Sequence, residues 1–280
     1  MSEGFAYVTG GASGLGKGVA QMLVKHNIKV FIADRDLEGA QKVVDELNKD
    51  SQVANCAHVD AASWNSQAKA FSQAVADFGR IDYVYPIAGI GERVSIPNQP
   101  SATGFQAPDL TVLDVDLTGV LYTVSLAMQQ FRRQEPGKNG LRGQIGCVAS
   151  VCGFYCCPTL PIYTAAKHAV VGLVRSYGKY LPEEKISMNA VCPNVIRTNI
   201  STGAFYDQLE KEGLLTPIEG VIDTFEKLLG EQTSGEIFEI SPNYKETGAI
   251  TRKGAEYIDK ESEKTFEMLY HRGRPLHQPR

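Results

Sequence analysis

The chain has no run of about eighteen consecutive apolar residues, the length that a membrane-spanning helix needs. Its first residues, MSEGFAYVTG, also lack the charged and then apolar pattern of a secretion signal. Basic residues are not in excess, because 28 Lys and Arg stand against 32 Asp and Glu, for a net charge of −4. We therefore expect a cytoplasmic protein with no membrane span and no general attraction for nucleic acid.

A metal-ligating pattern is missing as well. The six cysteines lie in or beside predicted strands and in one loop, and without a secretion signal they are better interpreted as reduced thiols than as disulfides. Cys152, Cys156 and Cys157 form a local group, but no histidine stands near them until His168. We favour an apolar loop lining over a metal cluster and predict no metal site.

What is present is centred on residues 143–167. A predicted strand ends on Ser150, and after a loop a helix begins near Tyr163. Tyr163 and Lys167 are four residues apart and share one helix face, where the lysine charge favours the phenolate and lowers the tyrosine pKa. Such a tyrosine can transfer protons, with Ser150 hydrogen-bonding the oxygen that gains or loses the proton. Taken alone, the pair would more simply be an ordinary helix surface.

A second pattern lies at the start of the chain. The strand-forming run FAYVTG opens into GASGLG ahead of a helical pattern. Gly10 permits a tight turn, Gly14 lets the backbone approach a phosphate, and Gly16 lets the helix pack near the strand with its positive end facing the anion. The next strand ends at Asp34, about twenty residues on, where a carboxylate would bind an adenine ribose.

Together these motifs, Thr9-Gly10-x-x-x-Gly14-x-Gly16 with Ser150, Tyr163 and Lys167, resemble the short-chain dehydrogenase/reductase family over residues 4 to about 241. The segment ADRD and the length are similar to NAD-dependent hydroxyprostaglandin dehydrogenases and fungal relatives. The resemblance implies NAD as cofactor and, besides Tyr163 and Lys167, the following contacts to it: Gly10, Ser13, Gly14, Leu15, Gly16, Asp34, Arg35, Asp60, Ala61, Ala88, Gly89, Pro193, Val195, Ile196 and Thr198.

Two of these residues keep a second interpretation. The resemblance implies that Asp60 contacts the adenine amino group, but it is equally suited to cap a helix over 63–78. Thr198 matches the position that hydrogen-bonds the nicotinamide carboxamide, and its alternative role is to cap the segment that follows.

At three positions the sequence departs from the family pattern. Ile87 replaces an asparagine that ties neighbouring strands, so its packing must replace those hydrogen bonds. Asn194 replaces a glycine, and it tolerates left-handed geometry better than most residues. Asp116 also replaces an asparagine, which in the family supports a water that links Lys167 to solvent. We count Asp116 among the catalytic residues, with an exposed helix residue as the alternative.

Strands and helices alternate along the chain, which predicts a single doubly wound α/β Rossmann domain. About seven parallel strands should carry helices on both faces, and the selected residues follow strand ends that converge at one crevice. We expect the catalytic domain over 1–244, with a surface loop over 92–108 and a substrate lid over about 199–216. Residues 245–280 form a C-terminal extension with a possible helix over 255–270.

The predicted activity is hydride transfer between NAD and a lipophilic secondary alcohol or ketone, as in secondary metabolism, with Tyr163 exchanging the proton. The alternative is the same scaffold with its redox role lost or replaced, as in a cyclase, isomerase or NAD-sensing partner. By resemblance, the helices over 109–133 and 163–180 pair across a twofold axis to give a homodimer or homotetramer. The lipophilic substrate is inferred from an apolar predicted lining: Ile96, Val151, Phe154, Tyr155, Ile196, Phe205 and Tyr206.

Overall fold

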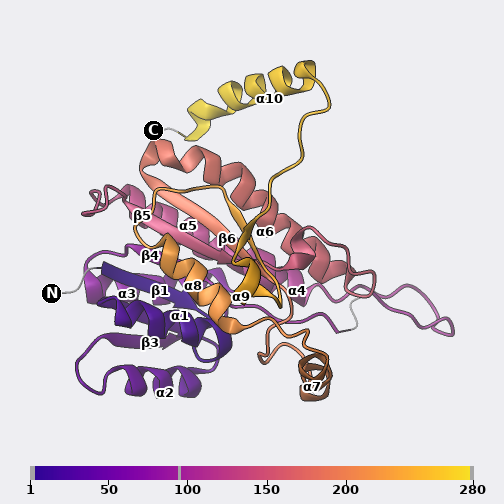
Figure 1. Cartoon of the computed structure of the whole chain (residues 1–280), viewed down its shortest axis with the longest axis horizontal. Helices are drawn as coiled ribbons and strands as arrows, with labels where there is room; N and C mark the ends of the chain where they lie inside the picture. Colours follow the sequence, from indigo (N-terminus) through magenta and orange to yellow (C-terminus); the bar gives the residue numbers. More distant parts are fainter. Residues whose placement is uncertain (1–3, 94–95, 278–280) are drawn as a thin grey trace.

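Seven parallel strands and one short antiparallel strand form the central sheet of the computed structural model, which describes residues 4–93 and 96–277 (Figure 1). The strands lie in the order β3-β2-β1-β4-β5-β6-β7-β8. The prediction of a doubly wound α/β domain is confirmed, and β8 is a strand that the sequence did not indicate. The bounds are β1 Gly4–Thr9, β2 Ile28–Asp34, β3 Ala54–His58, β4 Tyr83–Pro86, β5 Gly143–Val148, β6 Ile186–Pro193, β7 Ile237–Ile240 and β8 Ile250–Thr251.

Helices cover both faces of the sheet (Figure 1). All eight residues of β6 are buried, because a parallel strand with helices on both sides has no solvent face, and this explains its apolar sequence. One face packs against α1 Gly14–Lys25, α2 Leu37–Leu47 and α8 Ile218–Leu228. The other face packs against α3 Trp64–Phe78, α5 Val120–Arg132 and α6 Pro161–Tyr180.

The chain reverses its direction of travel across the sheet between β1 and β4, which are neighbours. At this point the buried Thr9 hydroxyl accepts hydrogen bonds from the backbone amides of Ile87 (3.1 Å) and Ala88 (3.2 Å). Ile87 packs against the core as expected, but Thr9 supplies the hydrogen bonds that tie the two strands. The carboxyl ends of β1 and β4 are therefore held together where such folds bind ligands.

The helix predicted over 109–133 is present but is not a uniform α-helix. It begins as α4 Thr111–Leu113, widens into a π-helical segment over Asp114–Gly119, and continues as α5. By length and composition alone, Thr111–Arg132 is the one helical run among the described residues that could cross a membrane. Val124 and Phe131 of this run are buried in the core against the sheet.

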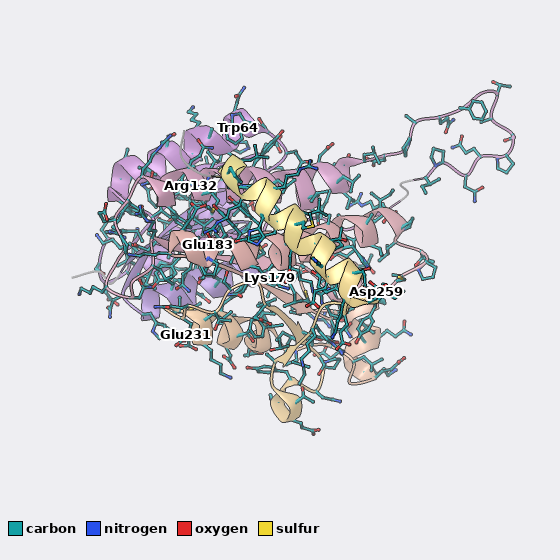
Figure 2. All side chains as sticks on the ribbon, turned by 90° about the horizontal axis from the view of Figure 1, so that it is seen from above. Trp64, Arg132, Lys179, Glu183, Glu231 and Asp259 are labelled. Atoms are coloured by element: carbon teal, nitrogen blue, oxygen red, sulfur yellow. The ribbon has the colours of Figure 1, made fainter. Side chains whose placement is uncertain are left out.

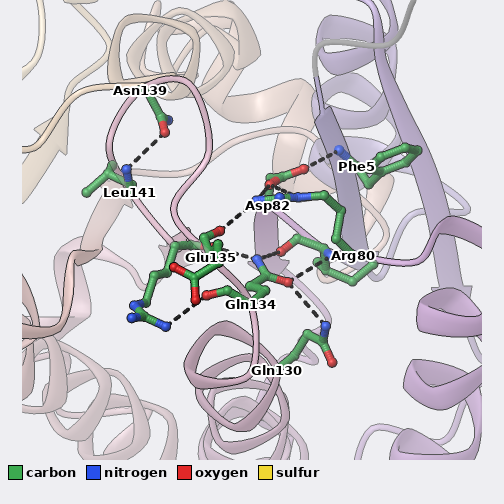
Figure 3. A network of polar contacts seen from close by, with 10 residues as sticks. Phe5, Arg80, Asp82, Gln130, Gln134, Glu135, Asn139 and Leu141 are labelled. Atoms are coloured by element: carbon green, nitrogen blue, oxygen red, sulfur yellow. Dashed lines mark hydrogen bonds and ion pairs between the residues drawn. The ribbon is translucent and has the colours of Figure 1, made fainter.

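A polar network fixes the opposite, amino edge of the sheet (Figure 3). Asp82 accepts a hydrogen bond from the backbone amide of Phe5 in β1 (3.0 Å) and pairs with Arg80 at 2.7 Å. The side chain of Gln134 donates to the carbonyl of Ile81 (2.6 Å). These bonds set the register of β1 and β4 at one edge and leave the carboxyl edge for a binding site.

The predicted C-terminal helix is α10 Lys260–Gly273, which crosses the outer side of α6 after Asp259 (Figures 1 and 2). None of its residues is buried. Its C-terminal end contacts α6 and the turn after it, because Tyr270 and Arg274 bind Glu183 and the ring of His277 packs against Tyr180 at 5.3 Å. The extension runs on to Arg280, but its last three residues lie outside the described part.

Two other surface segments were singled out from the sequence. Residues 96–110 form an exposed loop that projects from the body (Figures 1 and 2), while positions 94–95 of the predicted loop lie outside the described residues. The segment expected as a lid contains α7 Gly203–Lys211, a helix that the sequence analysis did not predict. Between β7 and β8 the chain makes one further short helix, α9 Tyr244–Thr247.

Candidate active site

Three predicted catalytic residues come together at the carboxyl end of β5 and the start of α6. Ser150 follows β5, and its Oγ accepts a hydrogen bond from the backbone amide of Cys152 (3.1 Å). α6 begins with Pro161, a favourable first residue, so Tyr163 stands in the first turn and Lys167 one turn further on. Lys167 Nζ lies 5.3 Å from the centroid of the Tyr163 ring.

Asp116 lies at the same place and is fully buried, which excludes the alternative of an exposed helix residue. Its Oδ2 is 2.9 Å from Lys167 Nζ, and its Oδ1 accepts from the backbone amide of Ile90 (2.8 Å). The resemblance implied a contact through water, whereas the structure has a direct ion pair. The π-helical segment places this carboxylate on the inner side of the helix.

The charges around Tyr163 act in opposite directions. Burial raises the pKa of Tyr163, Lys167 lowers it, Asp116 raises it again, and a hydrogen bond with Ser150 lowers it, with a net rise. The expected lowering by Lys167 is present but is outweighed. For Lys167, burial alone lowers the pKa, but Asp116 and Tyr163 reverse this, so that the ammonium stays charged.

Glu92 is a member of this site that the sequence analysis missed. Its Oε2 accepts a hydrogen bond from the backbone amide of Tyr163 (2.7 Å). The carboxylate therefore stabilises the first turn of α6 from a segment that follows β4. No sequence pattern indicated this contact, because the two residues are 71 positions apart.

The glycine-rich turn has the close backbone contacts that were predicted. Gly10 has a φ of +71°, and a Cβ there would lie 2.8 Å from the backbone of Ala88. A Cβ on Gly16 would lie 2.1 Å from the carbonyl oxygen of Gly10. Ser13 precedes α1 without capping it through its side chain, and the first turn contains no acidic residue. The amides of that turn, which includes Leu15, are thus available to an anion.

Asp34 lies beside this turn at the end of β2. It accepts hydrogen bonds from the backbone amides of Ala12 and Asp36, both at 2.9 Å. Asp36 caps α2 by accepting from Gly39 (2.9 Å) and adds a second carboxylate that the sequence analysis did not assign to the site. Arg35 between them is exposed.

The capping role considered for Asp60 is wrong. The N-cap of α3 is Ser63, whose hydroxyl accepts from Ser66 (3.3 Å), while Asp60 accepts from the backbone of Ala62 (3.0 Å). The Ala61 carbonyl accepts from the buried side chain of Gln67 (2.5 Å).

Gln67 joins this loop to the π-helical segment. It also donates to the carbonyl of Gly119 (2.9 Å). Gly119 itself packs closely on Ala61, because a Cβ there would be 2.8 Å from the Ala61 oxygen. The loop after β3 and the segment that carries Asp116 are therefore held to each other, and Gly89 packs against Asp116 from the other side.

The turn after β6 does not use left-handed geometry. Within the described ranges, Asn27 and Lys185 are the non-glycine residues with positive φ, so Asn194 is not among them. Its side chain instead accepts from the backbone amide of Val195 (2.9 Å), after β6 has ended at Pro193. The turn survives as predicted, but through a side-chain hydrogen bond.

The segment after β6 contacts the glycine-rich turn. Thr198 Oγ1 accepts from the backbone amide of Ile200 and lies near Tyr206 Oη, both at 3.3 Å. Asn199 donates to Ser13 Oγ (3.2 Å). Capping of α7 is done by Thr202, not Thr198. The methyl group of Thr198 lies over the glycine-rich turn, 3.4 Å from a Cβ built on Gly14.

Of the apolar side chains predicted to line the substrate site, some are buried and others are exposed. Ile196 and Tyr206 are buried, at 7% and 3% exposure. Ile96, Phe205 and Tyr155 are exposed. The last of these is held by its hydroxyl in a polar cluster with Glu239 and Arg252, which the sequence analysis did not anticipate.

The cysteines show no metal chemistry in the part of the chain that is described. Across 4–93 and 96–277, no group of three or more His, Cys, Asp and Glu side chains is placed to hold a metal ion. The six cysteines are free thiols. Burial raises the pKa of both Cys147 and Cys192 to about 12.

Comparison with known proteins finds chains that are similar over most of this sequence. The family model described as short chain dehydrogenase matches residues 4–208. The short-chain dehydrogenase/reductase prx7 of Penicillium rubens is 30% identical over 200 residues, covering 69% of each chain. The cyclohexanol dehydrogenase of an Acinetobacter species is 29% identical over 251 residues, covering 89% of this chain and 95% of that protein.

A solved structure shows the same fold. The 3-ketoacyl-(acyl-carrier-protein) reductase from Brucella melitensis, complexed with NADH, superposes with a TM-score of 0.71. The match covers 85% of this chain and 96% of that chain at 24% identity.

Proposed function

Because the chain belongs to the short chain dehydrogenase family, we propose that it transfers a hydride between NAD and a lipophilic secondary alcohol or ketone. The observation that carries this proposal is the row of buried Asp116, buried Lys167 and half-buried Tyr163 at the carboxyl edge of the sheet, with Ser150 beside it. A phenol that faces a buried ammonium is suited to proton transfer. In an ordinary pair on a helix surface, the lysine would be exposed to solvent.

The residues present fit a dinucleotide. The uncapped N-terminus of α1 can bind the pyrophosphate, with Gly14, Leu15 and Gly16 in its first turn. Asp34 would accept from the adenine ribose, and Thr198 would hydrogen-bond the nicotinamide carboxamide. When bound, the cofactor accepts the hydride from the carbinol carbon in oxidation and returns it in reduction.

The chain's own residues handle the proton. In oxidation, Tyr163 as phenolate takes the hydroxyl proton while the carbon–hydrogen bond breaks, and in reduction it gives the proton back. Ser150 orients the substrate oxygen through its hydroxyl. Lys167 favours the phenolate, and Asp116 keeps the ammonium in place and charged.

A preference for NAD over NADP follows from the charges beside the adenine ribose site. Asp34 and Asp36 both carry carboxylates there, and a 2′-phosphate would be repelled by each of them. Arg35 is exposed between them and is the one cation of this turn. The negative charge of the two carboxylates exceeds the positive charge of the one arginine, and this balance favours NAD over NADP.

A lipophilic substrate is supported by the exposed apolar side chains of the segments that follow β4 and β6, Ile96, Ile200 and Phe205. The similarity to a cyclohexanol dehydrogenase points the same way, because cyclohexanol is an apolar secondary alcohol. We also propose a cytoplasmic location and a homodimer or homotetramer formed through α5 and α6.

The test is to mix the purified protein with NAD and a panel of apolar secondary alcohols and to follow reduced-nicotinamide absorbance. Tyr163→Phe is the matched control, because it keeps the ring and removes the hydroxyl that exchanges the proton. The proposal expects activity in the wild type and its loss in this variant, with NAD binding retained in both. NAD binding with complete silence across the panel would instead favour a scaffold whose redox role is lost or replaced.

A further inference from the structure

A second polar cluster lies next to the active-site loop, where three segments of the chain meet. Glu239 of β7 is 8% exposed and binds the guanidinium of Arg252, which follows β8. Arg252 also donates to the hydroxyl of Tyr155, five residues after Ser150. The Tyr155 hydroxyl in turn lies 3.3 Å and 3.4 Å from the two Glu239 oxygens.

The guanidinium also packs on the aromatic side chains of the loop. Its central carbon is 5.6 Å from the Phe154 ring centroid and 5.7 Å from that of Tyr155. The two rings contact each other edge to face at 4.8 Å. Arg252 thus combines a planar fork of donors with two ring contacts, which a lysine cannot reproduce.

The same segment is attached to the helix that carries Tyr163 and Lys167. Arg175 of α6 donates to the backbone carbonyls of Arg252 (3.1 Å) and Lys253 (3.0 Å). The backbone amide of Arg252 bonds the carbonyl of Ile237 in β7 (2.8 Å). The start of the C-terminal extension is therefore joined to the sheet, to α6 and to the loop after Ser150.

We propose that Arg252 is a positioning residue of the active site, which holds the loop over 151–157 against β7 and so sets the place of Ser150. The expected effect on catalysis rests on the proposed function. The expected effect on the position of the loop does not, because it can be measured without a substrate.

The first part of the loop is anchored, because Val151 and Gly153 are buried and Phe154 packs against the core. The second part has little burial to hold it, since from Tyr155 to Leu160 the chain is exposed or half-buried. Glu239 needs a cation, since a buried carboxylate without a partner is costly. Arg252 both holds the loop, through Tyr155, and supplies the cation that Glu239 needs.

The cysteines of the loop provide a measurement that needs no substrate. Cys152 is half-buried within it, while Cys147 and Cys192 are fully buried in β5 and β6. In Arg252→Met, we expect a soluble thiol reagent to label Cys152 about tenfold faster, the factor that loss of a charge-assisted hydrogen bond brings to a local opening. Cys147 and Cys192 should stay protected, which shows that the fold is intact.

Two further variants separate positioning from the cost of an unpaired charge. Glu239→Gln combined with Arg252→Met leaves no buried ion without a partner, and we expect its Cys152 to be labelled as fast as in Arg252→Met. Arg252→Lys can pair with Glu239 but cannot also bind Tyr155, so its labelling rate should lie between those of the wild type and Arg252→Met. Wild-type protection of Cys152 in the double variant would overturn the proposal.

The kinetic arm uses an alcohol that the wild type oxidises. Tyr155→Phe keeps both ring contacts and loses only the hydroxyl, so we expect a smaller loss of kcat/KM than in Arg252→Met, with unchanged NAD affinity in both. A uniform loss of NAD binding would mean general damage and would overturn the positioning role. If no substrate is found, the proposed function fails, and the labelling experiment still decides whether Arg252 holds the loop.

Discussion

Replacing Asp116 by asparagine tests the charge balance at the proposed proton-transfer site. Lys167 Nζ is 2.9 Å from Asp116 Oδ2 and 5.3 Å from the Tyr163 ring centroid, so the carboxylate lies within about 8 Å of that ring. At about 8 Å and an effective dielectric constant of about 20, two unit charges repel by about 2 kcal/mol. That energy corresponds to about a thirtyfold change in the phenolate population while the phenol is mostly protonated.

The sign of the effect follows from the direction of each contribution. Asp116 raises the pKa of Tyr163, so asparagine lowers it and moves the rising limb of the oxidation profile to lower pH. We expect faster alcohol oxidation by Asp116→Asn at pH values below that limb, measured as kcat against pH. The amide oxygen can still accept from the backbone of Ile90, so the local structure should persist.

The controls address stability and the hydrogen bond. Breaking a buried ion pair costs about 3–5 kcal/mol, so Asp116→Asn should unfold at lower denaturant concentration. Asp116→Ala also leaves the Ile90 amide without its acceptor, and its turnover should fall at least about tenfold. An unchanged dependence of kcat on pH in Asp116→Asn would refute the reasoning. So would a shift to higher pH, which would mean that Lys167 loses its proton.

Three further predictions concern other parts of the molecule. The wild type should prefer NAD over NADP at least about tenfold in kcat/KM, and Asp34→Ser should narrow the gap; equal efficiencies would contradict the role of Asp34. A chain that ends at Lys253 should self-associate at least as tightly as the full chain in sedimentation, because it lacks α10, which crosses the outer side of α6. If both chains were monomers at all concentrations, the proposed dimer would be excluded. A hydrogen bond from Tyr270 and the contact with Arg274 lower the pKa of Glu183, so the docking of α10 is stabilised above the ordinary glutamate pKa of about 4.3 and weakens as pH falls below it. Protection from hydrogen exchange over 260–273, relative to the intrinsic rate at each pH, should fall at acidic pH, and Glu183→Gln should show the lower protection already at pH 7. Equal protection at both pH values would contradict this.

The sequence was sufficient for the fold because its main signals are local. Strands such as β1 and β2 are short apolar runs, and glycine or a polar residue marks their ends, as with Gly10 and Asp34. The spacing of Tyr163 and Lys167 places both on one helix face whatever surrounds them. These patterns are short in range, so no knowledge of the tertiary structure was needed.

The contacts that the sequence did not indicate are those between distant segments. Glu92 reaches the first turn of α6 across 71 positions, and Tyr155 meets Glu239 across 84. The direct ion pair of Asp116 depends on a π-helical segment, which has no reliable residue signature. Thr9 belongs to the quoted motif, but the sequence did not indicate that its hydroxyl would take the place of the missing strand-tying asparagine.

The short strand β8 has a consequence for association between copies of the chain. It covers the outer side of β7 with two residues, Ile250 and Thr251, and Arg252 then turns inward to Glu239. An exposed edge strand would offer a ladder of free amides and carbonyls to another sheet, whereas a very short one followed by a charged side chain offers almost none. A strand from another copy therefore cannot pair along this edge. A continuous intermolecular sheet, which could nucleate fibrous aggregation, cannot begin here.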